Sequence, residues 1–408
     1  MSHIGSSVEL LGLGEALHGG EEILIFRNRL FQRLVEVHGF TAIAIESSFP
    51  RGFLVNDYIA GRGPHAYEEI EEAGFGHGFG KVAANRELIE WMRDYNAGSP
   101  RGSRLAFYGF DIPGLAGGPT SPRAVLQVAI ECLSQVDPGA AARHADLIVR
   151  ALGDEARWEN PMLWRDPAAS GELLRDAATL RVATEEVVSE LQVKRPALIA
   201  TCGEQAFLDA MHHAVNARQL LSFFTALATG SNYAASLGVR DATMAENLAF
   251  VVTRERTHGK VLAFAHNKHL QRGQAGWQLG DDLLTWWPAG AHMARTMGPR
   301  YAVIGTAVGV SEGNGIAAPE PGTWEARLTA SPGPIRLVPL ADCPTVDPSA
   351  PATDGAATAG KTPLPERGRS RANPTYFPLN SQTPTDFDWV AAFDEVTYSR
   401  GGPPLASR

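Results

Sequence analysis

A histidine flanked by carboxylates stands early in the chain, within "LGLGEALHGGEE" (residues 11–22). The apolar run stops near Glu15, and His18, Glu21 and Glu22 follow within a few positions. A loop that only reverses the chain needs Gly, Asn or Pro, so this composition indicates chemistry. A neutral imidazole, with an ordinary pKa of about 6.5, can take a proton from water, and a neighbouring carboxylate can orient the ring. We therefore predict that His18 and Glu15 form a proton-transfer pair.

Three further ionisable residues, Glu46, Asp111 and His266, also close short apolar runs. These runs and the first one cover residues 8–14, 42–46, 104–110 and 260–266. Parallel strands end at one edge of their sheet, and open α/β folds bind ligands in the crevice outside that edge. We therefore expect Glu15, Glu46, Asp111 and His266 to converge on one edge.

Arg27 falls on the apolar face of a helix expected over residues 20–38, between Ile23 and Leu30 at about 100° per residue. A buried guanidinium is costly unless it is paired. We expect Arg27 to reach the carboxylates at the sheet edge. The alternative is that its side chain extends along the protein surface to water.

"AHNKHLQR" (265–272) places His266 and His269 three residues apart, on one side of a helical turn. A metal site would need a further ligand, such as His18 with Glu15 or Glu46. The spacing does not match a compact metal-binding motif. We expect acid–base histidines, no bound metal and no cofactor.

Ser311 lies in "GVSEG" (309–313), which matches the G-x-S-x-G pattern of a nucleophile elbow. Such an elbow leads directly into a helix. The following residues, "NGIAAPEPGTW", cannot begin one. Ser311 is therefore not predicted to be a nucleophile.

The apolar runs, together with residues 301–310 and 335–340, are mostly continuous rather than alternating, which is typical of a parallel sheet buried on both faces. Helical patterns lie between several runs, which indicates βαβ units. The predicted fold class is α/β, with a mostly parallel central sheet flanked by helices and a helical subdomain that forms a cleft.

The domain organisation follows from where strands are absent. Residues 121–230 show no clear strand and are predicted to be the helical subdomain, so residues 1–120 and 231–343 supply the two parts of the α/β core. Residues 344–374 are rich in Pro, Ala, Thr and Gly, and we expect a mobile loop there. Residues 375–408 are expected to return to the core.

Composition bounds the possible partners of the 408-residue chain. Its net charge of -9, from 36 basic and 45 acidic residues, argues against a nucleic-acid or membrane partner. No stretch approaches the roughly 18 apolar residues of a membrane span, and no secretory signal is visible. Cys132, Cys202 and Cys343 are too widely spaced for a disulfide framework. We expect a cytoplasmic monomer that acts on a small molecule.

Four motifs resemble the erythromycin esterase family: "GEALHGGEEILIFRNRL", "IAIESSF", "RDATMAEN" and "AHNKHLQR", in that order. The resemblance extends from about residue 8 to 310, with a weaker echo in "FDEVTYSR". It implies an α/β core, a helical subdomain, a deep cleft, and ester hydrolysis by water without a serine nucleophile. It also implies that His18 is the general base with Glu15 as its neighbour, that Arg27 and Glu46 line the cleft, and that His266 and His269 are a second histidine pair.

The expected site has two groups of residues. The catalytic group is His18, Glu15, His266, Arg27 and Glu46. The substrate-binding group is His269, Asp111, Arg240 and Asn267. The expected reaction is hydrolysis of a macrolide or other cyclic ester.

Two alternatives stay open at this point. A biosynthetic tailoring enzyme of the same family could use these groups for a non-hydrolytic proton transfer, as a lyase, dehydratase or cyclase acting on a polyketide-like molecule. A catalytically silent binding protein is the third possibility, but such a scaffold need not keep costly charges together. Roles in antibiotic resistance and in natural product biosynthesis are both compatible with the sequence.

Overall fold

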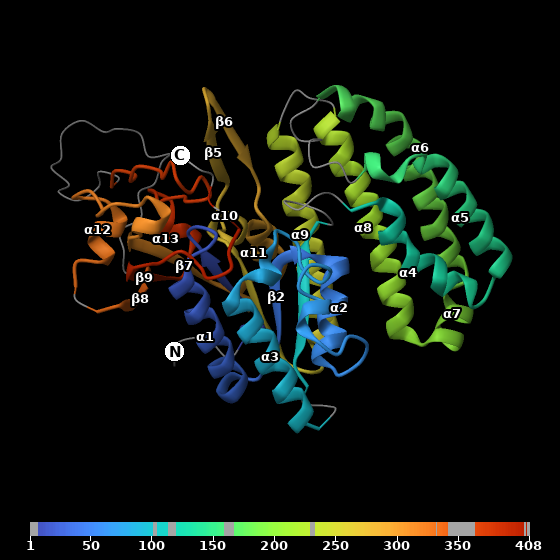
Figure 1. The fold of residues 1–408 in the computed structure, drawn as a ribbon, viewed down its shortest axis with the longest axis horizontal. Helices are drawn as coiled ribbons and strands as arrows, with labels where there is room; N and C mark the ends of the chain where they lie inside the picture. Colours follow the sequence, from blue (N-terminus) through green and yellow to red (C-terminus); the bar gives the residue numbers. More distant parts are fainter. Residues whose placement is uncertain are drawn as a thin grey trace.

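A seven-stranded sheet forms the centre of the protein (Figure 1). The computed structural model describes residues 7–100, 104–112, 120–158, 167–228, 233–331, 333–341, 364–403 and 405. The strand order is β3-β2-β4-β1-β7-β9-β8, and every pairing is parallel except that of β8 with β9. The strands are β1 (Leu10–Glu15), β2 (Phe40–Ser48), β3 (Ala106–Asp111), β4 (Lys260–His266), β7 (Tyr301–Val310), β8 (Ile335–Pro339) and β9 (Trp389–Glu395).

Continuous apolar runs form this sheet because both of its faces are covered. All six residues of β1 are buried, and β7 is buried up to its last residue. The runs predicted at 260–266 and 301–310 coincide with β4 and β7, and the other four overlap observed strands. Two features were not predicted as strands: β9, which lies between β7 and β8, and an antiparallel hairpin of β5 (Ala275–Leu279) and β6 (Asp282–Trp286).

Helices cover both faces of the sheet. On one face, α1 (Glu21–His38) and α3 (Ala83–Gly98) pack against Leu11 and Leu13 of β1. On the other face, α9 (Tyr233–Glu255) and α11 (Ala289–Met297) pack against Leu10 of the same strand. The remaining helices of this part are α2 (Phe49–Ile59), α10 (Asn267–Leu270), α12 (Trp324–Leu328) and α13 (Thr383–Asp386).

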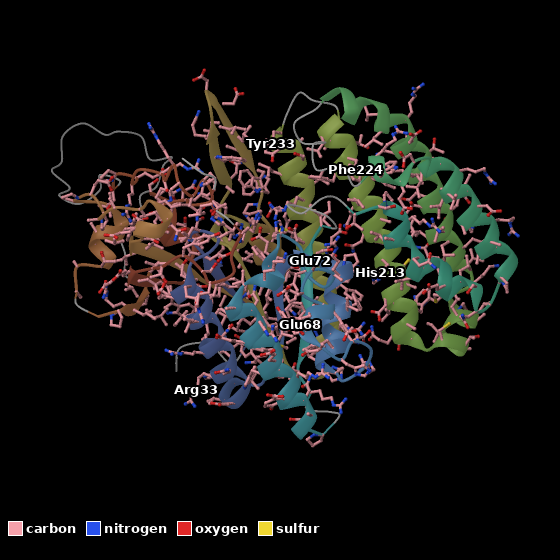
Figure 2. All side chains as sticks on the ribbon, viewed as in Figure 1. Arg33, Glu68, Glu72, His213, Phe224 and Tyr233 are labelled. Atoms are coloured by element: carbon pink, nitrogen blue, oxygen red, sulfur yellow. The ribbon has the colours of Figure 1, made fainter. Side chains whose placement is uncertain are left out.

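A bundle of helices between β3 and α9 has its own apolar core. It contains α4 (Pro122–Ser134), α5 (Pro138–Leu152), α6 (Pro167–Val193), α7 (Arg195–Cys202) and α8 (Glu204–Ala228), and it lies to one side of the sheet (Figure 1). Phe224, labelled in Figure 2, meets Trp158 edge to face with ring centroids 5.2 Å apart. The predicted fold class, a mostly parallel sheet flanked by helices with a helical subdomain, is confirmed.

The last part of the expected mobile loop is packed onto the core. Residues 344–363 lie outside the described residues. Arg367 and Asn373 are only 5% and 2% exposed. Arg367 donates hydrogen bonds to the carbonyl groups of Val308 and Gly309 at 2.6 and 2.9 Å. The prediction of a mobile loop is therefore wrong for residues 364–374, because backbone carbonyls and polar side chains supply the stabilisation that apolar residues do not.

Among the helices of the described ranges, none combines the length and the apolar character that crossing a bilayer demands.

Candidate active site

The carboxyl ends of four neighbouring strands bring the predicted ionisable residues together. Glu15 of β1 is in register with His266 of β4, and Asp111 ends β3. Glu46 lies near the end of β2. All four are at most 4% exposed. The prediction that they share one edge of the sheet is confirmed.

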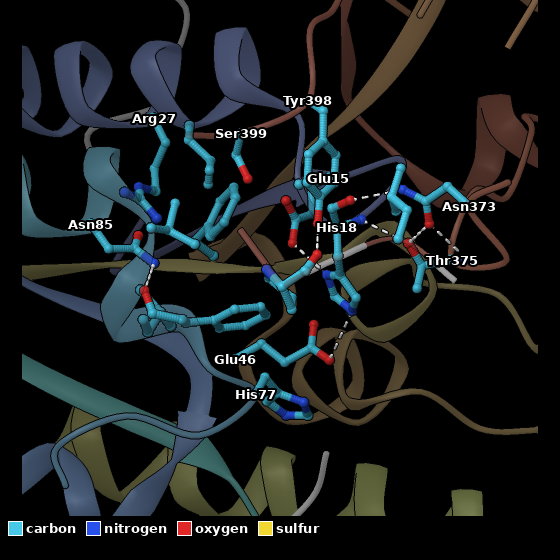
Figure 3. A pocket seen from close by; sticks show the side chains of 18 of the residues that line it. Glu15, His18, Arg27, Glu46, His77, Asn85, Asn373, Thr375, Tyr398 and Ser399 are labelled. Atoms are coloured by element: carbon cyan, nitrogen blue, oxygen red, sulfur yellow. Dashed lines mark hydrogen bonds and ion pairs between the residues drawn. The ribbon is translucent and has the colours of Figure 1, made fainter. Parts of the chain in front are cut away.

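His18 and Glu15 form a hydrogen-bonded pair at this edge (Figure 3). His18 Nδ1 lies 2.7 Å from Glu15 Oε1. The main chain of His18 is also held, because its N–H donates to Thr375 Oγ1 and its carbonyl accepts from Asn373 Nδ2, both at 3.0 Å. Nε2 makes no hydrogen bond to the described residues and lies 3.8 Å from Glu46 Oε1. Nδ1–H therefore donates to Glu15, which leaves the Nε2 lone pair available to a ligand.

Burial and charge act in opposite directions on this pair. Burial raises the pKa of Glu15, although the hydrogen bond and charge of His18 oppose the increase. Burial alone would lower the pKa of His18, but the charges of Glu46 and Glu15 outweigh it, so the pKa of His18 is raised. His18 is thus a stronger base than a free imidazole.

Glu46 interacts with several positively charged side chains near His18. Its Oε1 accepts from Arg240 Nη2 at 2.7 Å and lies 3.3 Å from His269 Nε2. Its Oε2 accepts from the backbone N–H of His266 at 2.8 Å. Burial would raise the pKa of Glu46, but the charges of His269, His18 and Arg240 hold it well below its usual range. The side chain of Glu46 is therefore ionised.

Arg240 joins Glu46 to Asp111. Its Nε and Nη2 donate to the two oxygens of Asp111 at 2.9 and 2.7 Å. His77 Nε2–H donates to Asp111 Oδ2 at 2.9 Å. Burial opposes ionisation of Asp111, but Arg240 and His77 lower its pKa. Asp111 is fully buried, is not among the residues that line the cavity, and positions Arg240 and His77. Its contact with substrate stays a prediction.

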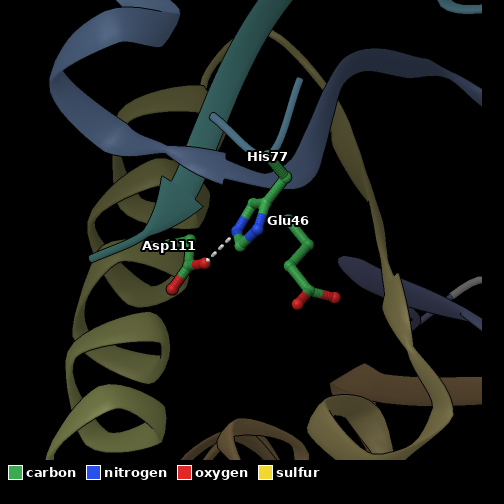
Figure 4. A group of neighbouring side chains, drawn as sticks. All are labelled: Glu46, His77 and Asp111. Atoms are coloured by element: carbon green, nitrogen blue, oxygen red, sulfur yellow. Dashed lines mark hydrogen bonds and ion pairs between the residues drawn. The ribbon is translucent and has the colours of Figure 1, made fainter. Parts of the chain in front are cut away.

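A metal ion fits this cluster poorly. One ligand atom each from Glu46, His77 and Asp111 lie within 4.8 Å of one another (Figure 4). However, the guanidinium of Arg240 already binds both carboxylates. A divalent cation would have to displace that buried cation or share its ligands, which Coulomb repulsion opposes.

His266 uses both ring nitrogens in backbone hydrogen bonds. Nδ1 accepts from Lys268 N–H at 3.0 Å, and Nε2–H donates to Thr375 O at 2.9 Å. Burial and the charge of His18 hold its pKa well below the ordinary value. His266 is therefore neutral and fully bonded, and the geometry does not support the predicted catalytic role. It caps α10 and fixes Thr375 beside His18.

His269 is a buried cation. Its Nδ1 lies 2.9 and 3.0 Å from the two oxygens of Asp241, which also accept from Trp286 Nε1 and Ala289 N. Burial would lower the pKa of His269, but Asp241 and Glu46 raise it to about 10. The ring does not line the cavity. Its charge holds Glu46, and its contact with substrate stays a prediction.

Asn267, the first residue of α10, joins this helix to β7. Its Nδ2 donates to Thr306 O at 2.9 Å, and its Oδ1 accepts from Thr306 N at 3.1 Å. The amide packs against Gly14, where an added Cβ would lie 2.2 Å from Asn267 Oδ1. With both ends of its amide hydrogen-bonded, Asn267 has a structural role, and its contact with substrate stays a prediction.

A cavity of about 280 Å³ opens beside His18. Its apolar wall is formed by Leu24, Ile45, Phe79, Val82, Phe264 and Leu405, and its polar groups include Glu15, His18, Arg27, Glu46, His77, Asn85, Thr375 and Ser399. These residues come from the α/β part and the C-terminal segment. None comes from the helical subdomain, which was expected to form one side of the cleft, and Ser311 does not line this cavity either.

Arg27 is buried in the cavity wall without a carboxylate partner. Its Nε and Nη2 donate to Asn28 Oδ1 at 3.0 and 2.7 Å, and its guanidinium lies 4.8 Å from the ring centre of Phe264. No Asp or Glu oxygen of the described residues lies within ion-pair distance. Burial lowers the pKa of Arg27 to about 10, although the charge of Glu15 opposes this. The expectation that Arg27 pairs with the strand-end carboxylates is wrong.

His77 is the site residue that the sequence analysis most clearly missed. It lines the cavity, and its ring centre is 6.4 Å from that of His18. Its φ of 59° is positive, a feature it shares with no other non-glycine residue of the described part. Such strained conformations concentrate at functional sites. The signal was present in "GFGHGFG" (74–80), where glycines surround a single histidine.

A model of the erythromycin esterase family matches residues 35–396. The chain belongs to the erythromycin esterase family. Erythromycin esterase type II from Escherichia coli is 23% identical over 301 residues, covering 72% of this chain and 68% of that protein. Erythromycin esterase type I from the same organism is 24% identical over 314 residues, covering 74% of this chain and 70% of that protein.

Solved structures of similar fold cover nearly the whole chain. A Bacillus cereus protein superposes with a TM-score of 0.70 at 19% identity, over 98% of this chain and 91% of that one. An erythromycin esterase mutant in its open conformation superposes with a TM-score of 0.69 at 19% identity, over 96% and 91%. At these identities the superpositions establish the fold, and family membership supports an esterase-like hydrolase.

Proposed function

We propose that this member of the erythromycin esterase family hydrolyses a carboxylic ester with water as the nucleophile and His18 as the general base. The observation that carries the proposal is the hydrogen bond between His18 Nδ1 and Glu15 at 2.7 Å. His18 lines the cavity, and its Nε2 makes no hydrogen bond to the described residues. This arrangement matches the requirement that a base be oriented on one nitrogen and reactive on the other.

In the proposed first step, a water molecule next to Nε2 gives its proton to His18 as its oxygen attacks the ester carbonyl. Glu15 stabilises the imidazolium that forms. Glu46 Oε1, 3.8 Å from Nε2, can accept the second hydrogen of that water and so direct its lone pair toward the carbonyl. The imidazolium then returns the proton to the leaving alcohol.

His77 is the proposed partner for the substrate carbonyl. Its ring lines the same cavity as His18 and is held by Asp111 through Nε2. Its Nδ1 makes no hydrogen bond to the described residues. When that nitrogen carries a proton, it can donate to the oxyanion of the tetrahedral intermediate.

The proposed substrate class is a macrolide or other cyclic ester, with macrolides suggested by the names of the curated relatives. Mass spectrometry of candidate esters incubated with the protein tests the reaction. A product heavier by one water, with the ester opened, is expected. A product that has lost water or rearranged without it would instead indicate a lyase or cyclase.

Mutagenesis tests the assignment of His18. His18→Ala is expected to lower turnover by about 100-fold or more while the fold is kept. Glu15→Gln should also lower turnover, because it removes the charge that stabilises the imidazolium. Since the two residues act as one unit, the double variant should lose much less than the product of the two effects.

The control is His65→Ala, which alters an exposed histidine that is not among the residues lining the cavity. Circular dichroism melting of each variant separates loss of chemistry from loss of fold. Turnover close to that of the wild type in a folded His18→Ala variant would refute the mechanism.

A further inference from the structure

One end of the cavity holds a buried cation, Arg27, that has no anionic partner among the described residues. Figure 3 shows Arg27 and Asn85 together, apart from His18 and Glu46. Arg27 is 1% exposed, and its Nε and Nη2 donate to Asn28 and, more weakly, to Ala84 O. Its remaining nitrogen, Nη1, makes no hydrogen bond to the described residues. A buried charge without a counter-charge is costly, so this position calls for a ligand.

Two more buried polar atoms along this cavity have no hydrogen-bond partner among the residues that the structure describes. They are Asn85 Oδ1 and Ser399 Oγ, on side chains that are 4% and 3% exposed. Most buried polar atoms in native proteins are hydrogen-bonded. The wall around them is apolar, with Leu24, Val82 and Phe264 among the lining residues. Unpaired polar atoms in an apolar wall are typical of a site that is completed by its ligand.

We propose that this end of the cavity is a subsite for a carboxylate on the acyl part of the substrate, bound by Arg27 and Ser399. The proposal rests on the proposed function, since it places the ester carbonyl at His18. A planar guanidinium matches a carboxylate better than other cations do, and the Ser399 hydroxyl can donate to the second oxygen. A substrate with this group would be an ester of a dicarboxylic acid.

The charges around the cavity favour one orientation of such a substrate. Glu15 and Glu46 carry negative charge next to His18, and each is engaged there, with His18 and with Arg240. They repel an anion at the catalytic end, whereas Arg27 attracts it at the other. Arg27 and His18 line the same cavity of about 280 Å³, so a short aliphatic linker suits a substrate that reaches both.

The test uses three ketones of equal size that cannot be hydrolysed: levulinate, levulinamide and isoamyl methyl ketone. They differ only in ending in a carboxylate, an amide or two methyl groups, and longer homologues of each extend the series. Binding to the wild-type protein is measured by titration calorimetry. Levulinate or its best homologue should bind about 10- to 100-fold more tightly than its neutral counterparts. Tighter binding of the amide, which Asn85 Oδ1 would favour, or of the methyl-terminated ketone would overturn the proposal.

Variants locate the preference. Arg27→Met should abolish the advantage of the carboxylate over the amide, and Arg27→Lys should keep part of it. Arg33→Met, which changes an arginine on the exposed side of the same helix, should leave it intact. An unchanged preference in Arg27→Met would refute the assignment. If Arg27→Met does not fold, the wild-type ligand series and Arg27→Lys still decide.

Because the ligands are not esters, this test is independent of turnover. A carboxylate preference without ester hydrolysis would leave the subsite standing and refute the proposed function. Hydrolysis without any carboxylate preference would refute the subsite and leave the proposed function standing.

Discussion

The buried imidazolium of His269 should make the stability of the protein depend on pH. Burial disfavours its charge, but Asp241 and Glu46 raise its pKa from 6.5 to about 10. The folded state therefore binds this proton more tightly than the unfolded state does. The stabilisation is fully present below about pH 6.5 and is lost as the pH rises toward 10.

The size of the effect follows from the shift in the pKa of His269. Each pKa unit corresponds to about 1.4 kcal/mol, so a shift of about 3.5 units sets a limit of about 5 kcal/mol. His269→Gln removes the titration but leaves both carboxylates with partners. Glu46 keeps Arg240, and Asp241 keeps the indole N–H of Trp286. The free energy of unfolding lost in this variant should therefore be several kcal/mol at pH 6 and should shrink at higher pH.

Urea unfolding, followed by circular dichroism between pH 6 and 10, measures the difference between wild type and His269→Gln. Groups that both proteins share cancel in that difference. His65→Gln, at an exposed position, serves as the matched control and should show no such trend. A difference that stays constant across this range would show that His269 is neutral and would refute the reasoning.

Three shorter predictions concern other parts of the site. Turnover should rise with pH through the raised pKa of His18, because only the neutral ring accepts a proton, so a pH–rate profile should show an acidic limb centred above 6.5. Gly14→Ala should destabilise the protein by about 1–3 kcal/mol in chemical denaturation, since the new methyl group would overlap Asn267 Oδ1; Gly238→Ala, on a helix with open space, is the control. Dialysis against a chelator should leave turnover unchanged because Arg240 occupies the carboxylates, and activity restored by added zinc would contradict this.

The strand ends could be predicted from the sequence because a buried parallel strand needs a continuous apolar run, and the residue that ends the run marks the edge. Glu15, Glu46, Asp111 and His266 were found in this way. Their individual roles could not be predicted from the sequence, because a position at the edge of the sheet does not show which groups the side chain contacts. His266 is bonded to the backbone and Asp111 lies beneath Arg240, and only the packing of other elements decides this.

Residues whose roles depend on contacts between distant elements could not be predicted from the sequence for a different reason. Thr375 and Asn373 lie in a stretch whose composition indicated a loop, and nothing local shows that it returns to His18. Asp241 lies buried within α9 and accepts a hydrogen bond from Trp286 of the β5–β6 hairpin, which was not predicted. Periodicity reports one element at a time, whereas these residues depend on contacts between elements.

The hydrogen bonds between the C-terminal segment and His18 affect how the protein folds during its synthesis. His18 N–H donates to Thr375 and the carbonyl of His18 accepts from Asn373, so these hydrogen bonds join residues 357 and 355 positions apart. A nascent chain therefore carries its proton-transfer pair from the start, but the main chain of His18 gains these hydrogen bonds only after that segment leaves the ribosome. Until β9 emerges, one side of β7 also has no neighbouring strand, a state that favours aggregation. Completion of the sheet and completion of the site are thus the same late event.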